Sequence, residues 1–354
     1  MKHNPLMSQL GLTAPIVQGP FGGGLSSVAL TQAVSDLGGL GSFGVHHLSS
    51  EGILDTANAI RAKTNKPFAL NLWIPFEESE LVASSSHSFA KHLERLLSYF
   101  KELGVEPPMA PQRFAPNFEE QIQAIIEVRP AVFSFVYGVP SAGIIEQCRS
   151  KGIITLGAAT TVEEAKLLET AGIDWIVASG FEAGGHRVSF MDTAERSLTG
   201  TFALVPQIVD AVRIPVIAAG GIADARGAKA AMALGASGIQ VGTAFLACQE
   251  SAASDLHKQK LFNANAHNTE LTRAFSGRLA RGIRNRFVDE LRGKEVAPYP
   301  LQNWIVGQLK QHALKQGRDD LVSLWAGQGV GLLKHHHAEA VFNELLGGIF
   351  HEDY

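Results

Sequence analysis

Cysteine is scarce in this chain of 354 residues, which contains only Cys148 and Cys248. Two cysteines provide neither a disulfide framework nor the ligand spacing of a zinc site. We expect both to be buried, because free cysteine packs as a small apolar residue.

Charge is also scarce, and it is not concentrated in one sign. Charged residues make up 18% of the chain, the formal net charge is -4, and there is no long basic run. The sequence therefore lacks the electrostatic footprint of a nucleic-acid-binding protein. Apolar residues make up 45%, which excludes extensive disorder and indicates a large core.

Long hydrophobic runs are missing as well. The first residues, MKHNPLMSQLGL, lack the apolar stretch of a signal peptide, and no run is long enough to cross a bilayer. We therefore expect a soluble cytoplasmic protein with no membrane partner. Assembly into a homodimer is left open beside a monomer.

The sequence does contain a regular alternation of short apolar runs and amphipathic segments. The runs are continuously apolar, which is typical of parallel strands buried on both faces. The expected strands are residues 15–19, 40–45, 68–74, 131–138, 152–158, 174–180, 214–221 and 237–243.

Helix signals separate these runs. Thr161 with Glu164 three residues later predicts a helix start, and Gly172 predicts its end. Asp224 and Gly235 repeat the pattern in the next such segment. Eight strands with crossover helices predict an α/β fold, a (β/α)8 TIM barrel.

Two stretches interrupt this rhythm after the third and eighth strands. Residues 76–116 and 250–310 read as helices with proline-rich or polar loops. Both follow strand ends that open on one face of a barrel, so we expect a smaller, mainly helical capping substrate domain there. The barrel itself would comprise residues 1–75, 117–249 and 311–354.

Two of the later strands end in glycine-bearing segments. Gly220-Gly221 precedes the helix at Asp224, and Gly242-Thr243 ends the eighth strand. Barrels often bind phosphate in the loops after strands seven and eight, where backbone N–H groups face the anion. We favour a phosphate site here over ordinary tight turns.

A G-x-G-x-x-G pattern at residues 39–44 is a poor dinucleotide signal. A Rossmann fingerprint follows a strand and opens a helix, whereas these glycines follow a helix and lead into a strand. We interpret them as a helix stop and a closely packed strand.

The first and third strands add further candidates. The segment QGPFGGG, Gln18 to Gly24, would let the backbone lie flat against a planar ligand, although a plain loop explains it equally well. Asn71 lies inside an apolar strand, and a buried amide must be paired. It pairs either with the backbone or, as we favour, with a ligand at the barrel mouth.

The segment ASGFEAGGHR follows the sixth strand, on the same face as the phosphate loops. Gly184-Gly185 would let the backbone approach a cofactor closely. His186 beside them is our candidate for a proton carrier or an anion partner. Glu182 is either an orienting group or a loop anchor, and Arg187 pairs with Glu182 or with another carboxylate.

The run His335-His336-His337 suggests metal binding at first sight. Consecutive helical residues do not share a face, and no Asp or Cys set accompanies them. We expect a solvated helix face and no metal.

Taken together and in order, six segments resemble the nitronate monooxygenases, formerly called 2-nitropropane dioxygenases. They are PIVQGPFGGG, SGFEAGGHR, PVIAAGGIAD, GIQVGTAFL, PYPLQN and WAGQGVGL. The resemblance spans almost the whole chain. It implies an FMN-containing barrel with a capping substrate domain, in which O2 oxidises alkyl nitronates such as propionate 3-nitronate to a carbonyl product and nitrite or nitrate.

The resemblance also assigns residues. His186 matches the family's active-site histidine, and we expect the flavin site to include Gln18, Gly19, Pro20, Phe21, Asn71, Ser179, Gly180, Gly184, Gly185, Gly220, Gly221, Gln240, Val241, Gly242 and Thr243. The chain departs from the family at Ser179, where many members have glutamine, and at Val188, where glycine is common. FGVHHLS also replaces the usual small-residue and proline turn after the second strand.

Two alternatives remain on the same barrel. The flavin-dependent enoyl-acyl-carrier-protein reductases share the EAGGH segment and would need NADH or NADPH. A flavin- or phosphate-binding barrel with a structural histidine would have no catalytic activity. The residues themselves suit a small anion, because a nitronate needs a cation or a hydrogen-bond donor, and a neutral nitroalkane would need a base to remove its α-proton.

Overall fold

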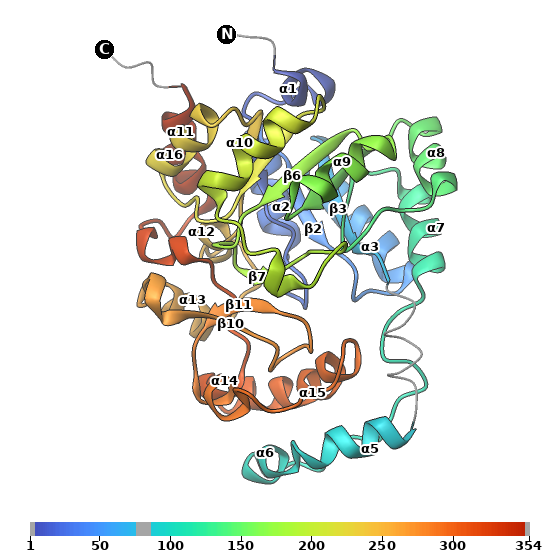
Figure 1. Cartoon of the computed structure of the whole chain (residues 1–354), viewed down its shortest axis with the longest axis vertical. Helices are drawn as coiled ribbons and strands as arrows, with labels where there is room; N and C mark the ends of the chain where they lie inside the picture. The colour runs from blue at the N-terminus through green and yellow to red at the C-terminus, as the bar shows by residue number, and fades with distance from the viewer. Residues whose placement is uncertain (1–3, 76–85, 351–354) are drawn as a thin grey trace.

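The computed structural model describes residues 4–75 and 86–350. They form a barrel with a smaller layer of chain over one end (Figure 1). Among these residues, no helix combines the length and apolar character that a membrane span requires.

All eight expected barrel strands are confirmed, and they pair in parallel in the order β1-β9-β8-β6-β5-β4-β3-β2. A parallel bridge between Val17 and Leu40 closes the ring, with the N–H of Gln18 donating to the carbonyl of Leu40 at 3.0 Å. The strands are β1 (Ile16–Gln18), β2 (Gly41–Gly44), β3 (Phe68–Trp73), β4 (Val132–Val136), β5 (Ile154–Ala159), β6 (Trp175–Ser179), β8 (Val216–Ala219) and β9 (Gly238–Val241).

One outer helix follows each barrel strand, which gives the complete (β/α)8 pattern. These helices are α2 (Val28–Asp36), α3 (Ser50–Arg61), α7 (Phe118–Val128), α8 (Ala142–Ser150), α9 (Val162–Thr170), α10 (Thr201–Ala211), α11 (Ala225–Ala233) and α16 (Ala338–Phe350). The main core lies between them and the sheet, and Cys148 and Cys248 are buried in it as expected.

The predicted helix caps are present. The Thr161 side chain accepts a hydrogen bond from Glu164 N, and the Asp224 carboxylate accepts two from the first turn of α11. Gly172 and Gly235 follow α9 and α11 with φ of 84° and 94°, a left-handed conformation that favours glycine. The helices α9 and α11 therefore begin and end at the residues that the sequence predicted.

The glycines at residues 39–44 also have the structural role that we inferred. Residues 37–39 separate α2 from β2. A Cβ on Gly41 would lie 2.0 Å from the carbonyl oxygen of Thr31, and one on Gly39 would lie 2.7 Å from that of Ile16. Close packing of strand against helix, rather than nucleotide binding, accounts for this pattern.

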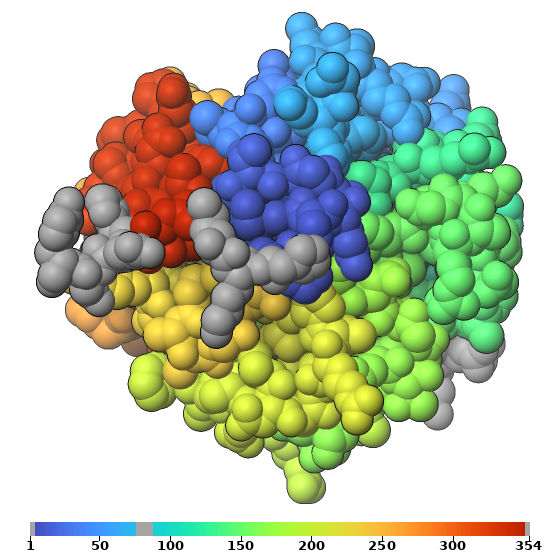
Figure 2. All heavy atoms as spheres, turned by 90° about the horizontal axis from the view of Figure 1, so that it is seen from above, coloured from blue at the N-terminus to red at the C-terminus, as the bar shows by residue number. Residues whose placement is uncertain are grey.

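A short helix, α1 (Pro5–Leu10), lies at the N-terminal ends of the strands. Its Leu6 is fully buried and packs with Trp175, Ile217 and other side chains of the barrel interior. The Asn4 amide donates to the carbonyl of Ser237 at 2.7 Å. Figure 2 shows this end of the molecule, with the blue α1 in the middle and the rest of the chain arranged around it.

The opposite end of the barrel lies under a second hydrophobic core. It is built from α5 (Ser86–Glu94), α6 (Leu97–Glu102), α13 (Asp255–Phe262), α14 (Arg286–Leu291) and α15 (Leu301–Lys315), together with the short α12 (Thr243–Leu246). Helices α5 and α6 come from the insertion after β3, and the others follow β9. These elements lie on the side of the barrel away from α1 (Figure 1).

The cap also contains a small sheet that the sequence reading missed. β10 (Thr269–Thr272), β11 (Ala280–Ile283) and the two-residue β7 (Gly185–His186) pair antiparallel in the order β10-β11-β7. β7 belongs to the loop that leaves β6, so this sheet connects the barrel to the cap. Strands this short carry too little periodic signal to be recognised before the chain is folded.

Ion pairs join the two inserted segments to each other. Glu295 accepts from Lys91 of α5 at 3.0 Å and from Arg95, which follows that helix, at 2.8 Å. Glu102 of α6 accepts from Arg286 at 2.8 Å and from Arg318 at 2.5 Å. These groups are partly exposed, so each pair contributes little to stability by itself. Their number fixes where the segment after β3 lies on the rest of the cap.

We propose a barrel-and-cap division with one boundary moved from the expected position. Helix α15 is continuous through residue 310, where the sequence suggested a return to the barrel. Leu321, Leu324 and Val330 still belong to the second core. The cap would then extend to about residue 333, and its first segment partly lies outside the described residues.

We predict that Leu6→Ala lowers the free energy of unfolding by about 2–5 kcal/mol, because it leaves a cavity in a closed barrel end. Urea denaturation followed by circular dichroism measures this. Leu167→Ala on α9 is the control. Leu167 is 41% exposed, so this substitution should lower the free energy of unfolding much less. Equal losses for the two variants would show that α1 does not seal the barrel.

Candidate active site

A cavity of about 680 Å³ lies between the C-terminal ends of the barrel strands and the cap. Most of the residues expected in the flavin site line it, and they come from every part of the sequence. They are Gly19, Pro20, Phe21, Asn71, Ser179, Gly184, Gly185, His186, Gly220, Gly221, Gln240, Gly242 and Thr243. Parallel strands bring these positions to one edge because all their carboxyl ends point the same way.

Three expected residues lie behind the cavity wall instead. Gln18 is fully buried, where its side chain donates to the carbonyl of Gly19 and accepts from the N–H of Ser42. Val241 is in the main core. A Cβ on Gly180 would lie 1.9 Å from Thr201 Oγ1. Each of them supports neighbouring residues that do line the cavity.

The loop after β8 supplies one flat part of the wall. Gly220 and Gly221 have φ of 115° and 72°, and a side chain other than glycine's would be strained there. Helix α11 begins shortly afterwards, at Ala225. The loop after β9 lies beside it, with Gly242 and Thr243 facing the same cavity.

The loop after β6 is anchored by two ionic side chains, the buried Arg187 and the half-buried Glu182. The Arg187 guanidinium donates to the carbonyl oxygens of Gly180, Ser179 and Ser197 at 2.7, 2.9 and 3.2 Å. Glu182 accepts from the backbone N–H and the hydroxyl of Thr201, each at 2.8 Å. The loop-anchor interpretation of Glu182 is the one that these contacts favour, and Arg187 binds carbonyl groups rather than a carboxylate.

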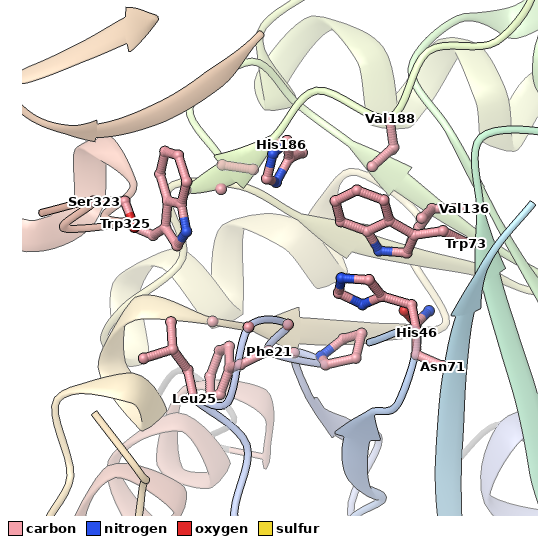
Figure 3. Close-up of a pocket in the computed structure, with 18 of the residues that line it drawn as sticks. Phe21, Leu25, His46, Asn71, Trp73, Val136, His186, Val188, Ser323 and Trp325 are labelled. Carbon is pink, nitrogen blue, oxygen red and sulfur yellow. The ribbon is translucent and has the colours of Figure 1, made fainter. Parts of the chain in front are cut away.

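His186 lies between two tryptophans, on the edge strand of the small sheet. Its ring centroid is 4.8 Å from that of Trp73 and 5.2 Å from that of Trp325. Figure 3 shows His186 above the cavity with these two rings on either side. Burial and the positive charge of Arg278 lower the pKa of His186 to about 3, so the imidazole is neutral at neutral pH.

The contacts of Ser276 assign the tautomer of His186. Its Oγ lies 2.7 Å from His186 Nε2, and it also contacts the N–H and the carbonyl of Arg278 at 3.3 and 3.2 Å. A hydroxyl donates one hydrogen bond and accepts two. All three are used if Ser276 donates to the carbonyl and accepts from the Arg278 amide and from Nε2–H. This assignment leaves Nδ1 of His186 as an acceptor.

An aromatic and cationic cluster lies next to His186, and the sequence analysis did not identify it. His46, Trp73 and Tyr299 of this cluster line the cavity. His46 stacks on Trp73 with centroids 4.1 Å apart and planes 10° apart. The Arg278 guanidinium lies 4.0 Å from the Tyr137 ring centroid and 4.4 Å from that of Tyr299. Isolated aromatic residues in a sequence are usually core residues, so no local signal would have shown this cluster.

Asn71 has a partner and also faces the cavity. Its amide donates to Ser134 Oγ at 3.0 Å, and the residue lines the cavity wall. The partner is a side chain rather than the backbone that the sequence analysis offered as one alternative, and contact with a ligand, the other alternative, stays a prediction. Ser134, on β4, orients the amide so that the rest of its polar surface faces the cavity.

The three consecutive histidines are outside this site, and our expectation of a helix there was wrong. They precede α16 in an irregular segment. His335 Nε2 lies 2.5 Å from the Glu344 carboxylate, and the His336 ring packs on Phe262 at 4.1 Å. Within residues 4–75 and 86–350 no group of three or more His, Cys, Asp or Glu could hold a metal ion.

A parallel barrel that opens into a partly apolar cavity with a few convergent polar groups is the architecture of a barrel enzyme. Comparison with known proteins identifies which kind. The chain belongs to the nitronate monooxygenase family, whose model matches residues 4–347, and it is therefore an oxidoreductase.

Individual relatives agree with this assignment. A probable nitronate monooxygenase of Staphylococcus haemolyticus is 38% identical over 97% of this chain and 96% of its own. The structure of nitroalkane oxidase from Streptomyces ansochromogenes is similar with a TM-score of 0.88 and 33% identity, over 97% of both chains. FabK from Thermotoga maritima is less similar, with a TM-score of 0.75 and 26% identity over 99% of this chain and 96% of its own.

We predict that the protein loses stability as the pH falls from about 6.5 to 5. Burial lowers the pKa of His186 to about 3 and that of His257 to about 4. In this range the unfolded chain binds protons that the folded chain does not. Each histidine therefore lowers the free energy of unfolding by up to about 2 kcal/mol at pH 5. Carboxylates titrate mainly below this range.

The variant His257→Gln tests whether the buried histidines cause this loss of stability at lower pH. His257 Nε2 lies 3.1 Å from the carbonyl of Trp325, and a glutamine amide can also donate to that carbonyl. Urea denaturation at several pH values should show a smaller loss of stability in the variant than in the wild type. An unchanged pH slope would contradict the prediction.

Proposed function

We propose that this protein oxidises alkyl nitronates with O2 to a carbonyl product and nitrite or nitrate, using FMN. Family membership supports the reaction type. The observation that carries the proposal for this chain is His186, a neutral imidazole beside two tryptophans and in front of glycine-lined loops. A small planar anion fits between such groups.

The residues present fit a flavin mononucleotide. The loops at Gly220-Gly221 and Gly242-Thr243 bring backbone to the cavity surface without side chains, after the seventh and eighth barrel strands. These are the positions where barrels bind a single terminal phosphate. The cavity continues from these loops past Gly19, Asn71 and Gly184, where a planar ring would have backbone on one side. When bound, the flavin supplies the electron transfer and the oxygen chemistry.

The chain's own contribution is to bind and orient the substrate and to exclude water. Trp73, Trp325 and Tyr299 cover the region around His186 with apolar surface. Arg278 provides positive charge close to this region, because its guanidinium lies 5.7 Å from the Trp73 ring centroid and 4.4 Å from that of Tyr299. An anionic substrate would therefore be stabilised by a nearby cation, while His186 offers a hydrogen-bonding nitrogen.

His186 is better suited to a substrate that has already lost its proton. A general base works best when its pKa is near the working pH, and the pKa of His186 is about 3. Its Nδ1 acceptor could remove the α-proton of a neutral nitroalkane, but only inefficiently. We therefore expect nitronates to be used more efficiently than the corresponding nitroalkanes.

We predict that the purified protein is yellow and releases FMN, rather than FAD, on denaturation. A single phosphate site without a second nucleotide fingerprint is the physical reason. Chromatography of the released flavin identifies the cofactor. FAD in the supernatant would contradict the proposal, and so would folded protein that binds no flavin when FMN is supplied.

We predict that His186→Asn lowers turnover of a neutral nitroalkane by up to about 100-fold, the lower end of the usual contribution of an acid–base group, because a base whose pKa is about 3 removes the α-proton inefficiently. Turnover of the preformed nitronate should fall much less, because no proton has to be removed. Oxygen uptake with both substrate forms measures this, and the flavin absorbance spectrum shows whether cofactor content is retained.

The same assay separates the alternatives. Equal, mild losses on both substrate forms would show that His186 is structural. Consumption of NADH or NADPH in the presence of an enoyl thioester, with no oxidation of nitronate, would instead favour the enoyl-acyl-carrier-protein reductase.

A further inference from the structure

His46 is a second imidazole that lines the cavity, and its backbone is held from two sides. It lies two residues after β2, where the N–H of Val45 donates to the carbonyl of Asn71 at 2.9 Å. The buried Gln121 side chain, on α7, donates to the carbonyl oxygens of His46 and Leu48 at 3.0 and 2.7 Å. Contacts with β3 and α7 therefore fix the place from which the His46 side chain extends.

The His46 ring is confined between two other parts of the cavity wall. On one face it stacks on Trp73, with centroids 4.1 Å apart and planes 10° apart. At its edge, a Cβ on Gly22 would lie 2.2 Å from His46 Cε1, so glycine is needed there to leave room for the ring. Figure 3 shows the His46 ring under that of Trp73, pointing into the cavity.

The surroundings of its two ring nitrogens assign the tautomer of His46. Burial is the main cause that holds the pKa of His46 well below its usual value, so the imidazole is neutral and carries one N–H. Its Nδ1 is buried, and no described residue forms a hydrogen bond with it. A proton on Nδ1 would leave a buried donor without an acceptor, which is costly. The proton is therefore on Nε2, the nitrogen that faces the cavity.

The two imidazoles of the cavity thus offer opposite hydrogen-bonding groups. His186 Nε2 is engaged by Ser276 Oγ at 2.7 Å, and its Nδ1 is an acceptor, which does not bind an anionic oxygen. His46 Nε2–H is a donor, and the charged groups that influence the pKa of His46 are all basic. Both rings contact Trp73, with centroids 4.1 and 4.8 Å from it. One small anion beside Trp73 can therefore reach both imidazoles.

We propose that His46 binds the substrate directly, by donating a hydrogen bond from Nε2–H to an oxygen of the nitro group. In a nitronate the negative charge already resides on these oxygens. It develops there when the α-proton of a nitroalkane moves to His186 Nδ1 and the electron pair of the C–H bond shifts into the nitro group. His46 stabilises this charge, and His186 accepts the proton. This inference rests on the proposed function, which supplies the anion.

The kinetic test compares His46→Phe with the wild type at saturating FMN. Phenylalanine keeps a flat ring for the stack on Trp73 but has no N–H. With the nitronate of nitroethane, KM should rise about 10- to 100-fold, the usual effect of losing a hydrogen bond to a charged group, and kcat should change little. A KM that stays at its wild-type value would overturn the proposal.

Three further variants separate the N–H from the ring. His46→Gln keeps an N–H donor and should recover most of the affinity that His46→Phe loses. Gly22→Ala keeps His46 but forces its ring to move, so KM should rise there as well, even if the phenylalanine variant does not fold. His267→Phe is the control, because His267 is exposed and does not line the cavity. Equal rises in His46→Phe and His46→Gln, or no rise in Gly22→Ala, would overturn the proposal.

A titration with FMN separates the substrate from the cofactor. The dissociation constant of FMN, measured by flavin fluorescence, should stay near its wild-type value in His46→Phe. Weaker binding of FMN together with an unchanged KM would place His46 against the flavin instead, and would overturn the proposal without affecting the proposed function.

A binding measurement decides the role of His46 even if no nitronate is oxidised, which would refute the proposed function. Acetate has the shape and the charge of the smallest nitronate, and acetamide has the shape without the charge. At equal ionic strength, acetate should raise the thermal midpoint of the FMN-bound wild type more than acetamide does, and His46→Phe should lose this difference. Equal shifts in the wild type, or a difference that persists in His46→Phe, would overturn the proposal.

Discussion

Close backbone contact between the loop after β6 and residues 326–329 is the constraint on which the cavity depends. A Cβ on Gly184 would lie 2.5 Å from the nitrogen of Gly327, and one on Gly327 would lie 2.8 Å from the carbonyl oxygen of Glu182. A hydrogen bond joins the same segments, because the N–H of Gln328 donates to the carbonyl of Glu182 at 2.8 Å. The N–H of Gly327 donates to Thr243 Oγ1, at the start of α12, at 2.9 Å. Glycine at these positions allows the chain after the cap to close one side of the site.

The electrostatics of the cavity follow from this closure. Around His186 water is largely excluded, so desolvation favours the neutral form of His46 and His186. Two neighbouring arginines, Arg187 and Arg278, have different surroundings. Arg187 binds three carbonyl oxygens. Arg278 packs on aromatic faces. The site therefore combines neutral imidazoles with nearby positive charge, which suits an anionic substrate better than a cationic one.

The barrel and the cap have separate roles in building this site. The barrel brings its glycine-bearing strand ends to one edge, and its stability comes from the core between sheet and helices. The cap supplies Ser276, which contacts His186, and Trp325 and Lys310, which line the cavity. The β10-β11-β7 sheet connects the cap to the loop after β6 that carries His186.

Much of the fold, and part of the candidate site, could be predicted from local sequence patterns. Continuous apolar runs located all eight barrel strands, Thr161 and Asp224 marked helix starts, and the paired glycines indicated which loops face the cavity. These features could be predicted because period, capping and glycine geometry are properties of a few adjacent residues. The small sheet, the stack of His46 on Trp73 and the charge of Lys310 inside the cavity depend on contacts between segments far apart in the chain. The low pKa of His186 has the same origin, since it arises from burial and from Arg278. Sequence by itself therefore determined the barrel and the edge where its site lies, whereas only the tertiary structure decided how polar, how closed and how charged that site is.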